Sequence, residues 1–184
     1  MADLTFNTPS GQTVARKMLL LCLNTGSSTT PAWSPIGKRV EDSSMEFDWN
    51  KQSKKDILGE TYTTYDEPII TQSFDPCELD SGDVAQVKLW NQAVKDHDTG
   101  AMANNDMLIV HLYAGTSGTA MFAERYASCA VEPTGLGGEG QVGMPIEVTF
   151  GGKRTLGTAS KDSSTGAITF TASTAPQVPE DPEG

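Results

Sequence analysis

The fold of this chain depends on an almost wholly apolar run, Met107-Leu-Ile-Val-His-Leu-Tyr-Ala114, which the turn Gly115-Thr-Ser-Gly118 follows. A short apolar run that ends at turn residues is typical of a buried, central strand. Residues 119–131 are expected to return antiparallel to it. Nearer the N-terminus, Lys17-Met-Leu-Leu-Leu-Cys-Leu23 is a second run of this kind, and its length favours a strand over a helix.

Residues 44–50 show a different pattern, in which apolar and acidic side chains alternate. Met45, Phe47 and Trp49 occupy every second position. Because successive side chains of a strand point to opposite faces, this alternation predicts a strand with one dry and one wet face.

This strand is expected to be the first of a long hairpin. Residues 50–59 are polar and contain three lysines, and residues 60–65 are rich in β-branched and aromatic side chains. The simplest arrangement pairs residues 44–50 with residues 60–65 and joins them through a polar tip, residues 50–59, that carries the lysines. A further extended segment is expected over residues 68–74.

The C-terminal third is predicted to add more strands. Residues 144–150 alternate between apolar and polar, and two short strands are expected over 155–160 and 167–172, joined by Lys161-Asp-Ser-Ser-Thr-Gly166. The acidic, proline-rich residues 174–184 cannot build a core and are expected to form a flexible tail.

One helix is expected over residues 81–96. Asp80-Ser-Gly-Asp83 supplies N-cap candidates, and Asp96-His-Asp-Thr-Gly100 is a sequence that ends helices. Apolar residues recur at helical spacing, with Lys88 on the opposite, polar side. The predicted buried face comprises Val84, Val87, Leu89, Trp90, Ala93 and Val94.

These elements predict a mainly β fold: an antiparallel β-sandwich or barrel with one flanking α-helix and a long β-hairpin loop. We assign residues 1–16 to an N-terminal arm, residues 17–173 to the β domain and residues 174–184 to the tail.

Composition narrows the class of protein. The chain has 184 residues, with 13 Lys and Arg against 24 Asp and Glu, so its formal net charge is −11. Proteins that grip nucleic acid need clustered basic residues, which argues against that function. Cys22, Cys77 and Cys129 are widely spaced and are expected to be small buried apolar residues. The apolar run 18–23 is far shorter than the about 20 residues of a membrane span, so no membrane partner is expected.

Few residues point to chemistry. Asp96-His-Asp98 is a compact polar triplet, but adjacent side chains converge poorly on one ion, so we interpret it as a solvated helix exit. His111 is expected to be a partly buried structural histidine. Gly135-Leu-Gly-Gly-Glu-Gly140 matches GxGxxG by accident, because it leads into a strand rather than a helix. Glu46 and Asp48 share a strand face that is expected to meet water. The chain is therefore predicted not to be an enzyme, with no catalytic residue, metal or cofactor.

The order of hairpin, helix and later strands resembles that of the tail tube proteins (major tail proteins) of long-tailed bacteriophages. The resemblance covers roughly residues 17–172 and is architectural. It rests on Trp33-Ser-Pro-Ile-Gly37, Met45-Glu-Phe-Asp-Trp49, Asp56-Ile-Leu-Gly-Glu-Thr-Tyr62, residues 80–98, residues 107–113 and the glycine-rich connection before Met144.

The resemblance implies a structural subunit that assembles with itself into hexameric rings, stacked into a hollow, acid-lined tube through which DNA passes without specific binding. It also implies partners such as the tape measure, tail tip and terminator proteins. The implied location is the virion tail, assembled in the bacterial host cytoplasm.

By the same analogy, the hairpin tip would reach a neighbouring ring, with a solvated tip as the alternative. The contact candidates are Asn50, Lys51, Lys54, Lys55 and Asp56. The acids that are candidates for the lumen or wet face are Glu46, Asp48 and Glu60.

Other classes remain open at this point. An immunoglobulin-like binding or adhesion module would favour a secretion signal and an even number of cysteines. A small hydrolase would have to use Asp96, His97 or scattered carboxylates. The sequence does not distinguish the tube protein of a contractile tail or of a type VI secretion-like device from the tail tube protein of a long-tailed phage.

Overall fold

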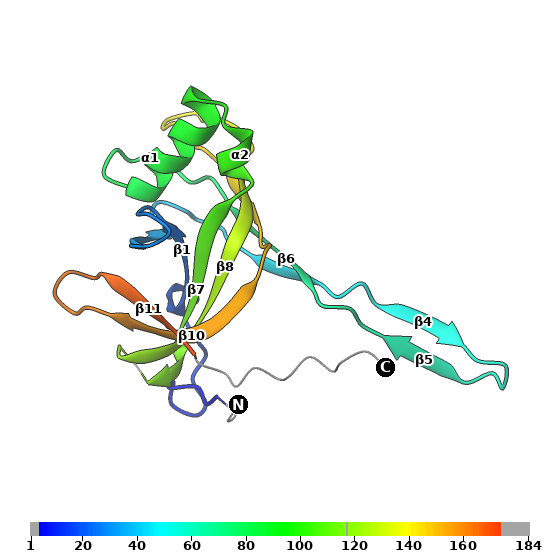
Figure 1. Cartoon of the computed structure of the whole chain (residues 1–184). Helices are drawn as coiled ribbons and strands as arrows, with labels where there is room; N and C mark the ends of the chain where they lie inside the picture. Colours follow the sequence, from blue (N-terminus) through cyan, green and yellow to red (C-terminus); the bar gives the residue numbers. More distant parts are fainter. Residues whose placement is uncertain (1–3, 117, 174–184) are drawn as a thin grey trace.

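The computed structural model describes residues 4–116 and 118–173. Most of its regular structure is strand, as predicted, and the helices of residues 84–102 lie together at one end of the body (Figure 1). In chain order the elements are η1 (Arg16–Met18), β1 (Leu19–Asn24), β2 (Trp33–Ile36), β3 (Met45–Asp48), β4 (Gln52–Lys55), β5 (Thr61–Thr64), β6 (Ile69–Phe74), α1 (Val84–Trp90), η2 (Asn91–Lys95), α2 (Thr99–Met102), β7 (Asn105–Thr116), β8 (Ala120–Pro133), β9 (Ile146–Thr149), β10 (Arg154–Lys161) and β11 (Ile168–Ala172).

The centre of the molecule is a closed antiparallel barrel. Its strands follow the order β10–β11–β2–β1–β7–β8, and β8 pairs back onto β10. The two apolar runs found in the sequence are neighbours in this barrel, since β1 pairs with β7 from Leu19–His111 to Leu23–Met107. β7 and β8 form the predicted antiparallel pair. The expectation of a sandwich or barrel is thus confirmed as a barrel.

The barrel is weakly closed between β2 and β11. Within the described chain these strands meet at the single pair Trp33–Ile168. Just beyond the β1–β2 pair, the Thr25 N–H donates to the Ala32 carbonyl at 2.8 Å. Because hydrogen-bonded and non-bonded pairs alternate along antiparallel strands, the backbone groups of Trp33 and Pro35 point away from β1 and toward β11. Because proline has no N–H, β2 cannot donate a second bond toward β11.

A second, smaller sheet continues from the barrel through β8. Residues Met121–Tyr126 of this strand pair with β10, whereas Ala130–Pro133 pair with β9. β9 then pairs with β6, and β6 pairs with β3 at the edge. One long strand therefore belongs to both sheets and fixes their relative orientation.

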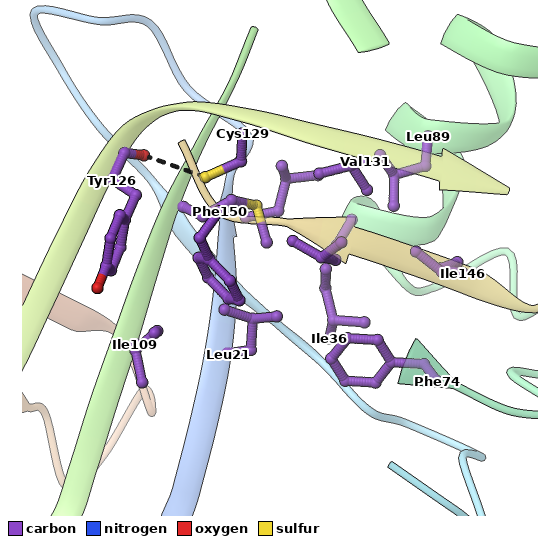
Figure 2. Close-up of a cluster of buried hydrophobic side chains, with 14 of the residues drawn as sticks. Leu21, Ile36, Phe74, Leu89, Ile109, Tyr126, Cys129, Val131, Ile146 and Phe150 are labelled. Carbon is purple, nitrogen blue, oxygen red and sulfur yellow. Dashed lines mark hydrogen bonds between the residues drawn. The ribbon is translucent and has the colours of Figure 1, made fainter. Parts of the chain in front are cut away.

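Two hydrophobic clusters fill the molecule. The barrel interior contains Cys22, Leu108, Val110, Met121 and Ala123, all at most 2% exposed. The larger cluster lies between the outer wall of the barrel, the second sheet and α1 (Figure 2). Because β1 and β7 are buried on both faces, their sequences are continuous apolar runs rather than alternating ones.

The helix forms where it was predicted, but it is rotated about its own axis, so that a different face than predicted packs on the body. Asp83 caps it by accepting a hydrogen bond from the Gln86 N–H at 3.1 Å, and η2 continues it to Lys95. The buried residues of α1 are Ala85, Gln86 and Leu89. The predicted buried face was wrong in part, because Val84, Val87 and Val94 are 60%, 41% and 36% exposed.

Polar anchors account for this rotation. The Gln86 side chain is buried, where Nε2 donates to the Glu78 carbonyl at 3.0 Å and Oε1 accepts from the Asp80 N–H at 2.8 Å. Lys88, which was predicted on the polar side of the helix, also contacts the body, since its Nζ donates to the Asn24 carbonyl at 2.7 Å. Two polar side chains that find specific partners on the body orient the helix, which apolar spacing alone does not reveal.

Four elements were not predicted, namely η1, β2, β4 and α2. β2 contains a proline, β4 is wholly polar, and α2 is a single turn that Asp98 caps through the Ala101 N–H at 2.9 Å. Cys22, Cys77 and Cys129 are buried free thiols, as predicted. The N-terminal segment contacts β7, since Phe6 bridges to Ala114, while the predicted tail 174–184 lies outside the described residues. None of the described helices is long and apolar enough to cross a membrane.

Candidate assembly interface on the hairpin arm

A two-stranded arm, residues 50–66, extends away from the body between β3 and β6 (Figure 1). At its base the Asp66 N–H donates to the Trp49 carbonyl at 3.1 Å, and Asn50 Nδ2 donates to Asp66 Oδ2 at 2.7 Å. Beyond this clasp β4 and β5 pair with each other from Gln52–Thr64 to Lys55–Thr61. A long hairpin is present, as predicted, but its pairing differs from the predicted one. β5 pairs with β4 in a sheet of their own, whereas β3 pairs with β6.

The tip of the arm is a tight turn that presents two apolar side chains. Asp56 organises it, because its Oδ1 accepts the N–H groups of Leu58 and Glu60, each at 2.9 Å. Gly59 has a φ of +86°, a conformation that glycine adopts without strain. Ile57 and Leu58 are 102% and 83% exposed. The expectation of a polar tip was wrong: the outermost side chains are apolar.

An apolar face also runs out along β3 toward the arm. Phe47 pairs in register with the buried Ile70, so it continues the face of the second sheet that packs on the core. Its ring stacks on Trp49 at 6.2 Å with an interplanar angle of 16°. Both side chains are 49% exposed. The alternation in β3 is thus as predicted, but the body does not cover the outer half of its apolar face.

The predicted contact residues lie along the arm rather than together at its tip. Lys54 and Lys55 are in β4, opposite Tyr62 and Thr61, and Lys51 Nζ lies 6.0 Å from the centre of the Tyr65 ring. The prediction of an unpaired loop over 50–59 was wrong because Gln52–Lys55 form a strand. Asn50 and Asp56 have structural roles, as the base clasp and the turn acceptor.

The three candidate acids are exposed but separate. Glu46 and Asp48 are on β3, on the face opposite to Phe47, where Asp48 pairs in register with the exposed Ile69. Glu60 is in the turn at the far end of the arm. They form no cluster with one another, and their position relative to a lumen stays a prediction.

Away from the arm, a buried polar network holds the barrel strands β7, β8 and β10 together. Glu124 of β8 lies 2.9 Å from His111 Nε2, accepts a hydrogen bond from Arg154 Nε at 2.7 Å and accepts another from the Tyr126 hydroxyl at 3.2 Å. Burial alone would raise the pKa of Glu124, but the His111 hydrogen bond and the Arg154 charge lower it. His111 Nδ1 also lies 2.8 Å from the Tyr113 hydroxyl.

This network was not foreseen, apart from the correct prediction that His111 is a satisfied structural histidine. The signal in the sequence is weak, because Glu124 and Arg154 are far apart in the chain and become neighbours only through the β8–β10 pairing. Every side chain in the network has a partner within the barrel. We interpret it as a structural crosslink between β7, β8 and β10.

The other candidates for chemistry stay apart. His97 is exposed and joins η2 to α2, while Asp98 is engaged in capping. Among residues 4–116 and 118–173, no group of three or more His, Cys, Asp or Glu side chains is placed to hold a metal. The feature of the described chain that most needs a partner is therefore the arm with its uncovered apolar side chains.

The sequence matches no protein-family model and no curated protein. Among solved structures the fold is similar to the sheath/tube terminator of an extracellular contractile injection system in its extended state, with a TM-score of 0.46, 10% identity, and coverage of 80% of this chain and 99% of that chain. A chain of the sheath–tube complex of such a system gives a TM-score of 0.47, 9% identity and coverage of 81% and 94%. The tube-terminating cap of an anti-feeding prophage gives a TM-score of 0.45 and 12% identity, with coverage of 83% of this chain and 96% of that chain. TM-scores below 0.5 leave the role of this chain to be argued from its own residues.

Proposed function

We propose that this protein is a structural subunit that assembles with copies of itself through the arm. The observation that carries the proposal is the arm itself, which extends past the body and ends in Ile57 and Leu58, 102% and 83% exposed. An isolated two-stranded hairpin is marginally stable in water. Contact with a second subunit would both cover these side chains and support the arm.

The assembly that we propose is a tube of stacked hexameric rings, of the tail-tube kind that the sequence resembles. Supporting it are the strand edges that the subunit leaves open. β3 is at the end of the second sheet and pairs only with β6 among the described strands. Unpaired edges are a hazard in a monomer, but identical subunits can use them as joints in a closed ring.

The proposed role of the tube is to let DNA pass. Residues 50–66 contain three lysines and three carboxylates, so the formal charge of −11 belongs entirely to the rest of the chain. A channel lined with such a surface repels phosphate and prevents DNA from sticking. Glu46, Asp48 and Glu60 remain the candidates for the wet or lumenal face.

The test compares the natural chain with a variant in which residues 51–65 are replaced by a two-residue turn. Such a turn is compatible with the base of the arm, because Asn50 and Asp66 are already hydrogen-bonded at 2.7 Å. Light scattering and negative-stain electron microscopy should show rings or tubes for the natural chain and monomers for the variant. A matched control, Lys54→Gln with Lys55→Gln, keeps the arm and its apolar tip and should still assemble.

Thermal melting of the arm-deleted variant should show a folded body, since the arm contributes nothing to either hydrophobic cluster. A natural chain that stays monomeric at high concentration would contradict the proposal. So would an arm-deleted variant that forms the same tubes.

A further inference from the structure

The helix α1 has an apolar face that the body leaves open. Val84 and Val87 of α1 and Val94 of the following η2 are 60%, 41% and 36% exposed, although their spacing is that of a helix face that is usually buried. The body instead buries Ala85, Gln86 and Leu89. The helix therefore has two apolar faces, of which the body covers one.

A small pocket adjoins this open face. Its volume is about 250 Å³ and its exposed surface is almost entirely apolar. The two larger polar side chains at its edge already have partners. Gln86 donates to the Glu78 carbonyl at 3.0 Å and accepts from the Asp80 N–H at 2.8 Å, and the Asp80 carboxylate pairs with Lys38 and accepts from the Gly82 N–H at 2.8 Å. An apolar occupant therefore leaves the hydrogen bonds of Gln86 and Asp80 intact. The pocket is lined by Leu79, Asp80, Ser81, Gln86, Val87 and Trp90.

We infer that the arm tip of a second copy of this chain, Ile57 and Leu58, occupies this pocket. The inference rests on the proposed function and names the receptor for the arm. The tip and the pocket share three properties: both are apolar, both are small, and neither is covered by the described part of its own subunit. In Figure 1 the arm leads away from α1, so the tip meets the helix of another copy rather than its own.

Charge favours the same pairing. Residues 50–66 are neutral overall, whereas the rest of the chain carries the full −11. Two bodies that approach each other directly repel, but a neutral arm approaches an acidic body with much less repulsion. The arm is therefore the part of one subunit best suited to contact the helix region of another.

This contact has a consequence for symmetry. Because the tip and the pocket are different surfaces, the contact is head-to-tail, and each subunit that offers a tip also offers a free pocket. Such contacts continue from subunit to subunit and end only by closing into a ring or by forming a filament. A two-fold dimer in which both partners use one shared surface is not expected from this contact.

The experiment uses two variants of the full chain. Ile57→Ser with Leu58→Ser removes the tip and keeps the pocket, and Val87→Asp fills the pocket with charge and keeps the tip. Each variant alone is expected to associate about 30-fold or more weakly, since one fully buried aliphatic side chain contributes an effect of this size. When the two variants are mixed, sedimentation velocity should show a 1:1 dimer that grows no further. Only the intact tip of one variant and the intact pocket of the other can still bind.

Matched controls separate this contact from general effects. Val94→Asp places the same charge on the same stretch of helix outside the pocket, and should leave the association constant within about threefold. Circular dichroism should show unchanged folding for every variant, because the substituted side chains are exposed. A chain with Leu58→Cys, mixed with one with Val87→Cys, should form an intermolecular disulfide on oxidation, since the natural cysteines are buried.

The outcomes distinguish the inference from the proposed function. If the natural chain assembles, the tip variant does not, and the Val87→Asp variant assembles normally, the tip docks elsewhere and the inference is overturned while the proposed function stands. The inference also fails if the two variants do not complement each other when mixed. If the natural chain does not assemble at all, the proposed function fails.

Discussion

Replacement of Glu124 by glutamine should destabilise the barrel although it changes hardly any volume. The side chain is 11% exposed and joins three strands through His111, Arg154 and Tyr126. A neutral amide keeps the shape but removes the negative charge that Arg154 faces at 2.7 Å. The effect therefore isolates the electrostatic part of the network from its packing.

The structure sets the size of the effect. Removing one partner of a buried ion pair costs about 3–5 kcal/mol when the remaining charge is buried. Arg154 is 44% exposed, so its guanidinium regains contact with water, and we expect a loss of about 2–3 kcal/mol. For a chain of this length that corresponds to a melting temperature lower by about 5–10 °C.

The assay is thermal unfolding followed by circular dichroism at neutral and acidic pH. Because the pKa of Glu124 is lower in the folded protein than in the unfolded chain, its charge stabilises the fold above the ordinary glutamate pKa of about 4.3. That stabilisation is lost as the pH falls through the lowered pKa. The difference between the natural protein and Glu124→Gln should be complete near pH 7 and shrink toward pH 3.

Glu147→Gln is the matched control, since Glu147 is exposed on β9, and it should change stability by less than about 0.5 kcal/mol. A Glu124→Gln protein as stable as this control at pH 7 would refute the reasoning. A difference that grows as the pH falls would refute it equally.

Two further substitutions test the packing. Gly157→Ala should destabilise the barrel by about 1–3 kcal/mol, because a Cβ there would lie 2.2 Å from the Thr171 carbonyl oxygen. The control is Gly140→Ala, where nothing lies within 4 Å of the added Cβ. Equal melting temperatures of the two variants would show that β10 and β11 are not so close at Gly157. Leu89→Ala should cost about 2–5 kcal/mol in urea unfolding because Leu89 is 1% exposed. Val94→Ala, on the exposed side of η2, should cost under about 1 kcal/mol. If Val94→Ala cost more than Leu89→Ala, the observed orientation of α1 and η2 would be contradicted.

Sequence patterns predicted most of the fold because local chemistry determines where strands and turns occur. The apolar runs that became β1 and β7 and the alternation in β9 each identified a strand. β4 escaped detection because Gln52-Ser-Lys-Lys55 has no apolar side chain. Its pairing with β5 is stabilised by the tight turn at Asp56 and Gly59 rather than by burial.

The sequence located the hairpin that forms the candidate interface, but it did not predict which kind of side chain the hairpin exposes. The sequence pointed to the hairpin and to its lysines, yet the side chains left most exposed are Ile57 and Leu58. A signal was present, since these are apolar residues within a polar stretch, flanked by an aspartate and a glycine typical of a turn. Whether the side chains of such a turn fold back onto the body or project from it depends on the path of the whole arm.

The sequence by itself determined the strands, the turns, the position of the helix and the acidic balance, because each depends on neighbouring residues and on composition. Only the tertiary structure decided which helix face the body covers, that Glu124 meets Arg154, and that apolar side chains remain open on α1 and on the arm. The reason is physical. Periodicity shows which side chains share a face, but only the packing of distant segments shows whether the subunit's own body covers that face or leaves it open to another copy.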